Sequence, residues 1–209
     1  MCGRFVLISL LSDVERAFDI HEVSCDYRTS RNMLPGQDVP AVVSNGGNRL
    51  VCFRWGLIPS WARDPSIGRK LINARAETIA VKPSFRSAFR RRRCLIVANG
   101  FYEWRKEGSR KKPIHLFLKS GQPFGFAGLY ESWRSPQAER INTCTIVTTG
   151  ANELVSPIHD RMPVIVPKEK EAVWLDPSCE NQSELLSILK PYPSEEMSVE
   201  EVSPQFFRQ

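Results

Sequence analysis

Short apolar runs with β-branched and aromatic residues predict a chain rich in β-strands. The segments 2–7, 38–44 and 49–55 have the length and composition typical of strands. The sequence Asn-Gly-Gly-Asn at 45–48 separates the last two, and such a turn predicts a hairpin. Further strands are expected at 93–99, 101–106, 113–119, 124–130, 142–149 and 162–167.

Helical patterns are confined to short segments. Ser12 and Glu15 have the spacing of a capping box at the start of a helix over 12–18. The residues of this segment that we expect to face the core are Leu11, Val14 and Phe18. Other helices are predicted at 73–80, 83–90, 170–175 and 183–190, with Pro83 in the first turn of its helix.

Together these elements predict an α+β fold. We expect a single domain over residues 1–209, built around a curved, barrel-like, mainly antiparallel sheet with short flanking helices. A short C-terminal tail would begin at about residue 204. The chain shows no internal repeat and no linker rich in Pro, Gly or Ser that would divide it.

Composition favours a soluble, cytoplasmic protein. The chain has 209 residues, 42% of them hydrophobic, which is enough for one well-packed domain. No segment approaches the roughly 18 apolar residues of a membrane span, and no signal peptide is apparent. The six cysteines are scattered without a C-x-x-C pair, so we expect reduced thiols, no metal site and no cofactor.

The formal net charge of +6 permits a polyanionic partner. Its distribution is more informative, because five arginines lie close together in one stretch: Arg86, Arg90, Arg91, Arg92 and Arg93. Phosphate contact is the favoured interpretation of this arginine run. A second basic group over 105–112 fits a solvated hairpin tip equally well.

The N-terminus carries unusual candidate chemistry. After removal of Met1, Cys2 would hold a free α-amine and a thiol on adjacent carbons. Their unperturbed pKa values, about 7.7–8.0 and about 8.5, leave both groups partly deprotonated near neutrality. A cysteine at position 2 is by itself weak evidence for a catalytic role. The chain also contains, in order, the blocks "MCGRF", "WGLIPSWA", "INARAE", "NGFYEW" and "SPIHDRMP".

These five ordered blocks resemble the SOS-response-associated peptidase (SRAP) family of abasic-site processing proteins. The resemblance implies that Cys2 traps the ring-opened aldehyde of an abasic site in single-stranded DNA as a thiazolidine. It also implies that Asn73, Glu103 and His159 belong to the catalytic site. Chemically, Glu103 could transfer protons at the amine, Asn73 could orient it, and His159 could open the sugar ring.

The same resemblance, with the chemistry of single-strand binding, suggests a DNA-binding set. It consists of Arg4, Asn32, Pro35, Trp55, Trp61, Arg75, Arg86 and Thr149. The arginines would contact phosphates, while Pro35 and the tryptophans would support or wedge bases. Trp55 fits the core as well as it fits a base platform, and the strand residue Thr149 could simply pack.

Other function classes remain open. The family name records a proposed peptidase activity, so Cys2 with Glu103 and His159 could cleave the leading methionine or an N-terminal propeptide, although an aminopeptidase could also remove the methionine. A non-covalent single-strand binder in which Cys2 is incidental is the second alternative. We expect a monomer associated with DNA, which would be nuclear in a eukaryote, and no membrane partner.

Overall fold

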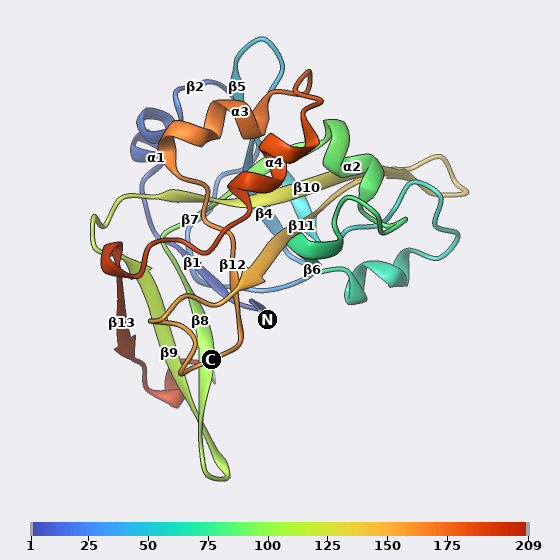
Figure 1. Cartoon of the computed structure of the whole chain (residues 1–209). Coiled ribbons are helices and arrows are strands. Elements are labelled where there is room, and N and C mark those ends of the chain that lie inside the picture. The colour runs from blue at the N-terminus through green and yellow to red at the C-terminus, as the bar shows by residue number, and fades with distance from the viewer. Residues whose placement is uncertain (1, 208–209) are drawn as a thin grey trace.

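A closed five-stranded β-barrel forms the centre of the computed structural model, which describes residues 2–207 (Figure 1). The strand order around the barrel is β11, β10, β7, β4 and β5, and β5 returns to β11 through a parallel pairing. The other neighbours pair antiparallel. These strands are β4 (Asp38–Ser44), β5 (Asn48–Trp55), β7 (Arg93–Ala98), β10 (Phe124–Arg134) and β11 (Arg140–Gly150). The predicted α+β fold with a barrel-like sheet is therefore confirmed.

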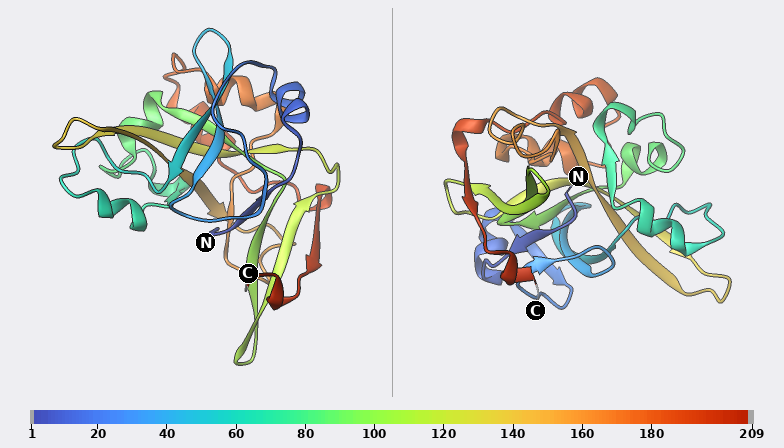
Figure 2. Two further views of the ribbon diagram at one scale, coloured as in Figure 1. Left: turned by 180° about the vertical axis from the view of Figure 1, so that it is seen from behind. Right: turned by 90° about the horizontal axis from the view of Figure 1, so that it is seen from below.

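A second sheet packs beside the barrel. Its strand order is β13 (Met197–Glu201), β9 (Arg110–Leu118), β8 (Gly100–Glu107), β1 (Phe5–Leu7) and β3 (Ser30–Met33). Figure 2 shows the β8–β9 hairpin extending away from the barrel, with β13 running beside β9. The basic group over 105–112 thus lies at the tip of this hairpin.

Short strands and helices complete the fold. The strand β2 (Ile20–Ser24) runs parallel to β5, whereas β6 (Asn73–Arg75) and β12 (Arg161–Pro163) both pair with β11. The α-helices are α1 (Leu11–Phe18), α2 (Arg86–Arg91), α3 (Glu171–Leu175) and α4 (Gln182–Ile188). Short 3₁₀ helices are η1 (Pro65–Lys70), η2 (Ala76–Thr78), η3 (Lys168–Lys170), η4 (Ser194–Glu196) and η5 (Pro204–Phe207). Among residues 2–207, no helix combines the length and apolarity that a bilayer crossing needs.

The hydrophobic core anchors the N-terminal strand. The ring of Phe126 lies 5.9 Å from that of Phe5 and 6.0 Å from that of Phe101, and all three are fully buried. Burial of each such side chain contributes about 1.5–3 kcal/mol to folding. Because Phe5 is only three residues after Cys2, this packing also fixes where the candidate nucleophile lies.

Most local predictions are confirmed. The hairpin over 38–55 forms with Ser44 opposite Asn48, and Val14 and Phe18 of α1 are buried while Leu11 is half-buried. The capping box is wrong, because α1 begins at Leu11 with Leu10 as its N-cap. The backbone N–H groups of residues 13 and 14 donate to Leu10 O, which places Ser12 inside the first turn.

Two predicted helices need correction. Residues 73–75 form β6, since parallel pairing with β11 overrides the helical propensity of an alanine-rich segment. The helix expected over 83–90 begins only at Arg86, so Pro83 precedes it in a turn. The strand predicted at 162–167 is regular only to Pro163, and the sequence patterns did not predict β2, β3 or β13.

Candidate active site

Cys2 lies immediately before β1, beside β8. Its side chain is fully buried, and its Sγ contacts Arg4 O at 3.8 Å. Antiparallel pairing of Phe5 with Phe101, and the hydrogen bond from Tyr102 N to Arg4 O, hold this segment against β8. Met1, and with it the expected removal of that residue, lies outside the described residues.

Asn73 contacts the backbone of Cys2 from β6. Its Nδ2 donates a 2.9 Å hydrogen bond to Cys2 O across 71 positions of sequence. The pairing of β6 with β11 supports this contact by fixing the backbone of Asn73 opposite Ile146. The Asn73 Oδ1 is buried and has no hydrogen-bond partner in the described part of the chain. Such an oxygen is about 1–3 kcal/mol less stable than a satisfied one, so a nearby donor would be favoured.

Glu103 brings a carboxyl to the same place from β8. Only 3% of Glu103 is exposed, so this residue does not face bulk solvent. Burial raises the pKa of the Glu103 carboxyl, while nearby positive charge, including that of His159, acts in the opposite direction. Burial also raises the pKa of the Cys2 thiol, and the charge of Glu103 raises it further.

His159 reaches the same region from the loop before β12. It lines a cavity of about 360 Å³ together with Glu103, Trp104, Lys106 and Lys111. Its Nδ1 lies 3.0 Å from the backbone N–H of Arg161, which donates to it, and 2.8 Å from a carboxylate oxygen of Asp160. An accepting Nδ1 leaves the proton of the neutral ring on Nε2, whereas the protonated ring can donate to Asp160.

Arg161 fixes the loop that carries His159. Its guanidinium donates to both carboxylate oxygens of Glu77 at 2.5 and 3.0 Å and to Thr148 O at 2.6 Å. This bidentate pair ties the loop to η2 and β11. Arg161 stands in the "SPIHDRMP" block, but nothing in the sequence identifies Glu77 as its partner.

Arg4 occupies an aromatic and polar setting next to Cys2. Its Nη1 donates to Asn32 Oδ1 at 3.0 Å, so these two predicted DNA-binding residues lie together. The guanidinium also lies 5.7 Å from the ring centroid of Trp104 and 5.0 Å from that of Phe207, in cation–π geometry. The expected tail from about residue 204, described to Phe207, thus packs against the candidate site, a contact that the sequence did not reveal.

The remaining DNA-binding candidates divide into exposed and buried residues. Arg75 and Pro35 are exposed, and the side chain of Trp61 is 58% exposed with its Nε1 3.4 Å from Pro83 O. Trp55 is only 1% exposed and donates to Ile72 O, so the prediction of a base platform there is corrected to a core role. Thr149 is 7% exposed within β11 and packs in the barrel, which argues against its predicted phosphate contact.

The arginine run also divides. Arg86 is exposed on α2, as a phosphate contact would require. Arg91 pairs with Glu180 and Arg92 with Glu131, both at 2.9 Å or less. Arg93 is buried and donates to backbone carbonyls, including Trp174 O and Phe89 O at 2.8 Å, so it belongs to the fold.

The described residues thus bring Cys2, Asn73, Glu103 and His159 together from four separate segments. No group of three or more potential metal ligands of the His, Cys, Asp or Glu type occurs within residues 2–207. The site therefore combines a buried cysteine before β1, an amide from β6, a carboxyl from β8 and an imidazole from the loop before β12.

Comparison with known proteins identifies the class. The sequence model of the SOS response associated peptidase (SRAP) family matches residues 1–208, and the chain belongs to this family. It is 46% identical over 207 residues to the Abasic site processing protein YoqW of Bacillus subtilis (strain 168), covering 97% of this chain and 92% of YoqW. YoaM of the same organism, also named an abasic site processing protein, is 46% identical over 207 residues and covers 97% of this chain and 91% of YoaM.

A solved structure supports the fold. A crystal structure of a protein from Bacteroides thetaiotaomicron superimposes with a TM-score of 0.92 at 30% sequence identity. The match covers 100% of this chain and 95% of the other chain. The barrel, the second sheet and the flanking helices are therefore shared across the full described length.

Proposed function

We propose that this protein binds single-stranded DNA and traps abasic sites through Cys2 as a covalent thiazolidine. One observation carries the proposal: the Asn73 side chain hydrogen-bonds the backbone of Cys2 where Glu103 and His159 also converge. The names of the relatives, abasic site processing proteins, support the same substrate.

The chemistry begins with the sugar. An abasic site exists mainly as a closed hemiacetal, and proton transfer at the ring oxygen by His159 would open it to the aldehyde. The α-amine of Cys2, free after removal of Met1, then attacks the aldehyde carbon. Loss of water gives an imine, and Glu103 supplies the proton that leaves with the water. Asn73 Oδ1 would accept a hydrogen bond from the amine and hold it in line.

Ring closure completes the reaction. The imine forms in its protonated state, the Cys2 sulfur adds to its carbon while the π electron pair of the C=N bond moves to nitrogen, and the thiol proton passes to the Glu103 carboxylate left by the dehydration. Because burial and Glu103 raise the pKa of the thiol, it reaches this step as the neutral form and needs a base beside it.

The test uses the purified protein and an oligonucleotide with a single abasic site. We expect a shifted band on a denaturing gel that survives heating, and a mass that equals protein without Met1 plus DNA minus one water. Intact DNA and a tetrahydrofuran analogue of the abasic site, which has no aldehyde, are the controls. A fully occupied complex that dissociates on the denaturing gel would exclude covalent trapping in favour of the non-covalent alternative.

Arg75 provides a test of phosphate binding. It is exposed at the end of β6, two residues after Asn73, so a strand that reaches Cys2 would pass it. Substitution Arg75→Ala should weaken binding to intact and abasic single strands alike. It should also reduce the slope of log affinity against log salt by about 0.7, the value for one phosphate contact. Titration across a salt series measures both quantities.

The control for this prediction is Arg140→Ala, which removes an exposed arginine at the far end of β11. It changes the net charge equally and should leave the salt slope unchanged. Equal effects of the two substitutions would mean that Arg75 acts only through overall charge.

A further inference from the structure

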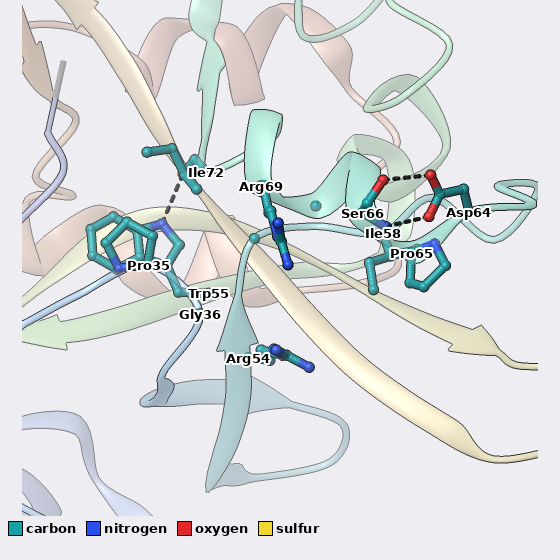
Figure 3. Close-up of a pocket in the computed structure, with 12 residues that line it drawn as sticks. Pro35, Gly36, Arg54, Trp55, Ile58, Asp64, Pro65, Ser66, Arg69 and Ile72 are labelled. Atoms are coloured by element: carbon teal, nitrogen blue, oxygen red, sulfur yellow. Dashed lines mark hydrogen bonds between the residues drawn. The ribbon is translucent and has the colours of Figure 1, made fainter.

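A second cavity, of about 470 Å³, lies between η1 and the end of β5 (Figure 3). Its lining includes Arg54, Arg69, Pro35, Ile58 and Ile72. Sequence patterns gave no role to either arginine. The cavity is separate from the one formed by Glu103 and His159, with which it shares no lining residue.

Two glycines create the close approach that forms this cavity. A Cβ at Gly56 would lie 2.8 Å from Gly68 O, and a Cβ at Gly68 would lie 2.7 Å from Gly56 O. Both distances are shorter than real side chains tolerate, and Gly56 also has a φ of +132°. Only this glycine pair lets η1 pack directly on the segment after β5, which places Arg69 on the same opening as Arg54.

The two guanidinium groups line one opening, and the one acidic residue among its lining residues is Asp64, whose charge interacts with that of Arg69. Among residues 2–207, neither Arg54 nor Arg69 forms an ion pair with a carboxylate, and both are exposed. The acidic residue of the lining, Asp64, is engaged locally. Its carboxylate accepts hydrogen bonds from the Ser66 backbone N–H at 2.8 Å and from the Ser66 hydroxyl at 2.5 Å. Two like charges at one opening repel each other, so an anion between them would be stabilised.

The rest of the lining suits the uncharged part of a nucleotide. Pro35, Ile58 and Ile72 supply apolar surface beside the two cations. A phosphate group matches the planar donors of a guanidinium, and a sugar or base can rest on apolar side chains. A free inorganic anion has no uncharged part that could contact this apolar surface.

The cavity is also connected to the candidate active site through two chain segments. Ile72 directly precedes Asn73, whose side chain binds the backbone of Cys2. Pro35 follows β3, which carries Asn32, the hydrogen-bond partner of Arg4. A DNA strand bound at Cys2 could therefore continue over either segment into the cavity.

We propose that this cavity binds a nucleotide of the DNA strand flanking the abasic site, with its phosphate held by Arg54 and Arg69. This inference rests on the proposed function, since it takes the substrate to be a DNA strand. It adds a binding subsite whose contacts are independent of the aldehyde.

The test compares the parent protein with the double variant Arg54→Gln/Arg69→Gln. The probes are oligonucleotides with a central tetrahydrofuran site, trimmed step by step from the 5′ or the 3′ end, so that no covalent bond forms. The parent should lose affinity when one of the two flanks is shortened. The double variant should lose that dependence, and its salt slope should fall by about 1.4, which corresponds to two phosphates.

Two further variants make the result specific. Arg63→Gln removes an exposed charge from the same loop outside the cavity and should retain the parent slope and flank dependence. Arg54→Lys/Arg69→Lys keeps both charges and should retain most of the slope. Thermal unfolding confirms that each variant is folded.

The outcomes separate this inference from the proposed function. If the parent crosslinks an abasic oligonucleotide but the double variant keeps the full slope and flank dependence, the cavity proposal is wrong and trapping stands. If the parent forms no crosslink yet the double variant loses flank dependence, the subsite is real and the covalent proposal is wrong. An equal effect of Arg63→Gln would mean that Arg54 and Arg69 act only through the overall charge of the protein, and the cavity proposal would be overturned.

Discussion

Replacement of Cys2 by alanine is expected to abolish the heat-stable crosslink to abasic DNA. The thiazolidine needs the sulfur and the amine on adjacent carbons, and alanine retains only the amine. An imine can still form, so the variant should give a crosslink that dissociates on heating but becomes permanent after reduction with borohydride. A denaturing gel run with and without the reductant distinguishes the two products.

The matched control is Cys179→Ala, which removes a half-buried thiol in the segment between α3 and α4. It should crosslink at the parent level. An undiminished heat-stable crosslink from Cys2→Ala would exclude the thiazolidine, and a parent protein that is fully active with Met1 retained would exclude the amine. Cys2→Ala could also lose all crosslinking, including the reducible form, while it keeps its affinity for intact strands. That result would mean that formation of the imine itself requires the thiol.

Local patterns predicted the fold well where the structure is local. The hairpin over 38–55 depends on two β-rich runs and a glycine turn, all of which are adjacent in the sequence. The segment 73–75 was predicted wrongly, because its strand exists only through pairing with Ile146 to Thr148 of β11. Likewise β13 pairs with β9 from about eighty residues away, and no local signal marks it.

The candidate site shows the same division. The chemistry of Cys2 and the blocks around Asn73, Glu103 and His159 could be named from the sequence. Their contacts could not, since the bond from Asn73 Nδ2 to Cys2 O depends on where β6 lies against β11. The two tryptophans illustrate the limit. Both stand in one loop block, yet Trp55 is 1% exposed and Trp61 is 58% exposed.

Arginine side chains were the least predictable. A run of charge suggested phosphate binding, but Arg93 is used to bind carbonyl groups of the fold and Arg92 pairs with Glu131. In contrast, Arg54 and Arg69 lie outside the arginine run, and only the close packing of Gly56 and Gly68 brings them to one cavity. Charge counts along a sequence do not reveal which charges remain available for a ligand.

The second large effect is expected at His159. We expect His159→Ala to slow crosslinking by roughly 10²- to 10⁴-fold, the usual loss when a positioned acid or base is removed. Binding to intact single strands should stay nearly unchanged, because the proposed role is proton transfer at the sugar. The rate of crosslink formation is measured from samples that are quenched at successive times and run on denaturing gels. The substrates are the natural abasic site and one whose aldehyde is already open.

The structure also suggests a purely structural role, and a second variant separates the two. His159 Nδ1 accepts a hydrogen bond from Arg161 N, and this contact helps to shape the loop. In His159→Asn, the Oδ1 atom can occupy the place of Nδ1 and accept the same bond, but an amide cannot transfer a proton near neutral pH. If the imidazole of His159 transfers protons, His159→Asn should crosslink the natural abasic site as slowly as His159→Ala does.

The substrate whose aldehyde is already open shows whether His159 acts in the opening of the sugar ring. His159→Ala should form crosslinks with it at close to the parent rate, because ring opening is no longer required. Release should slow together with formation on the natural site, since the donor for opening is the acceptor on the return path. Full recovery of the rate by asparagine would assign His159 to the loop instead. A loss of equal size on both substrates would place its proton transfer at the amine, where Glu103 was expected to act, and the two roles would have to be exchanged.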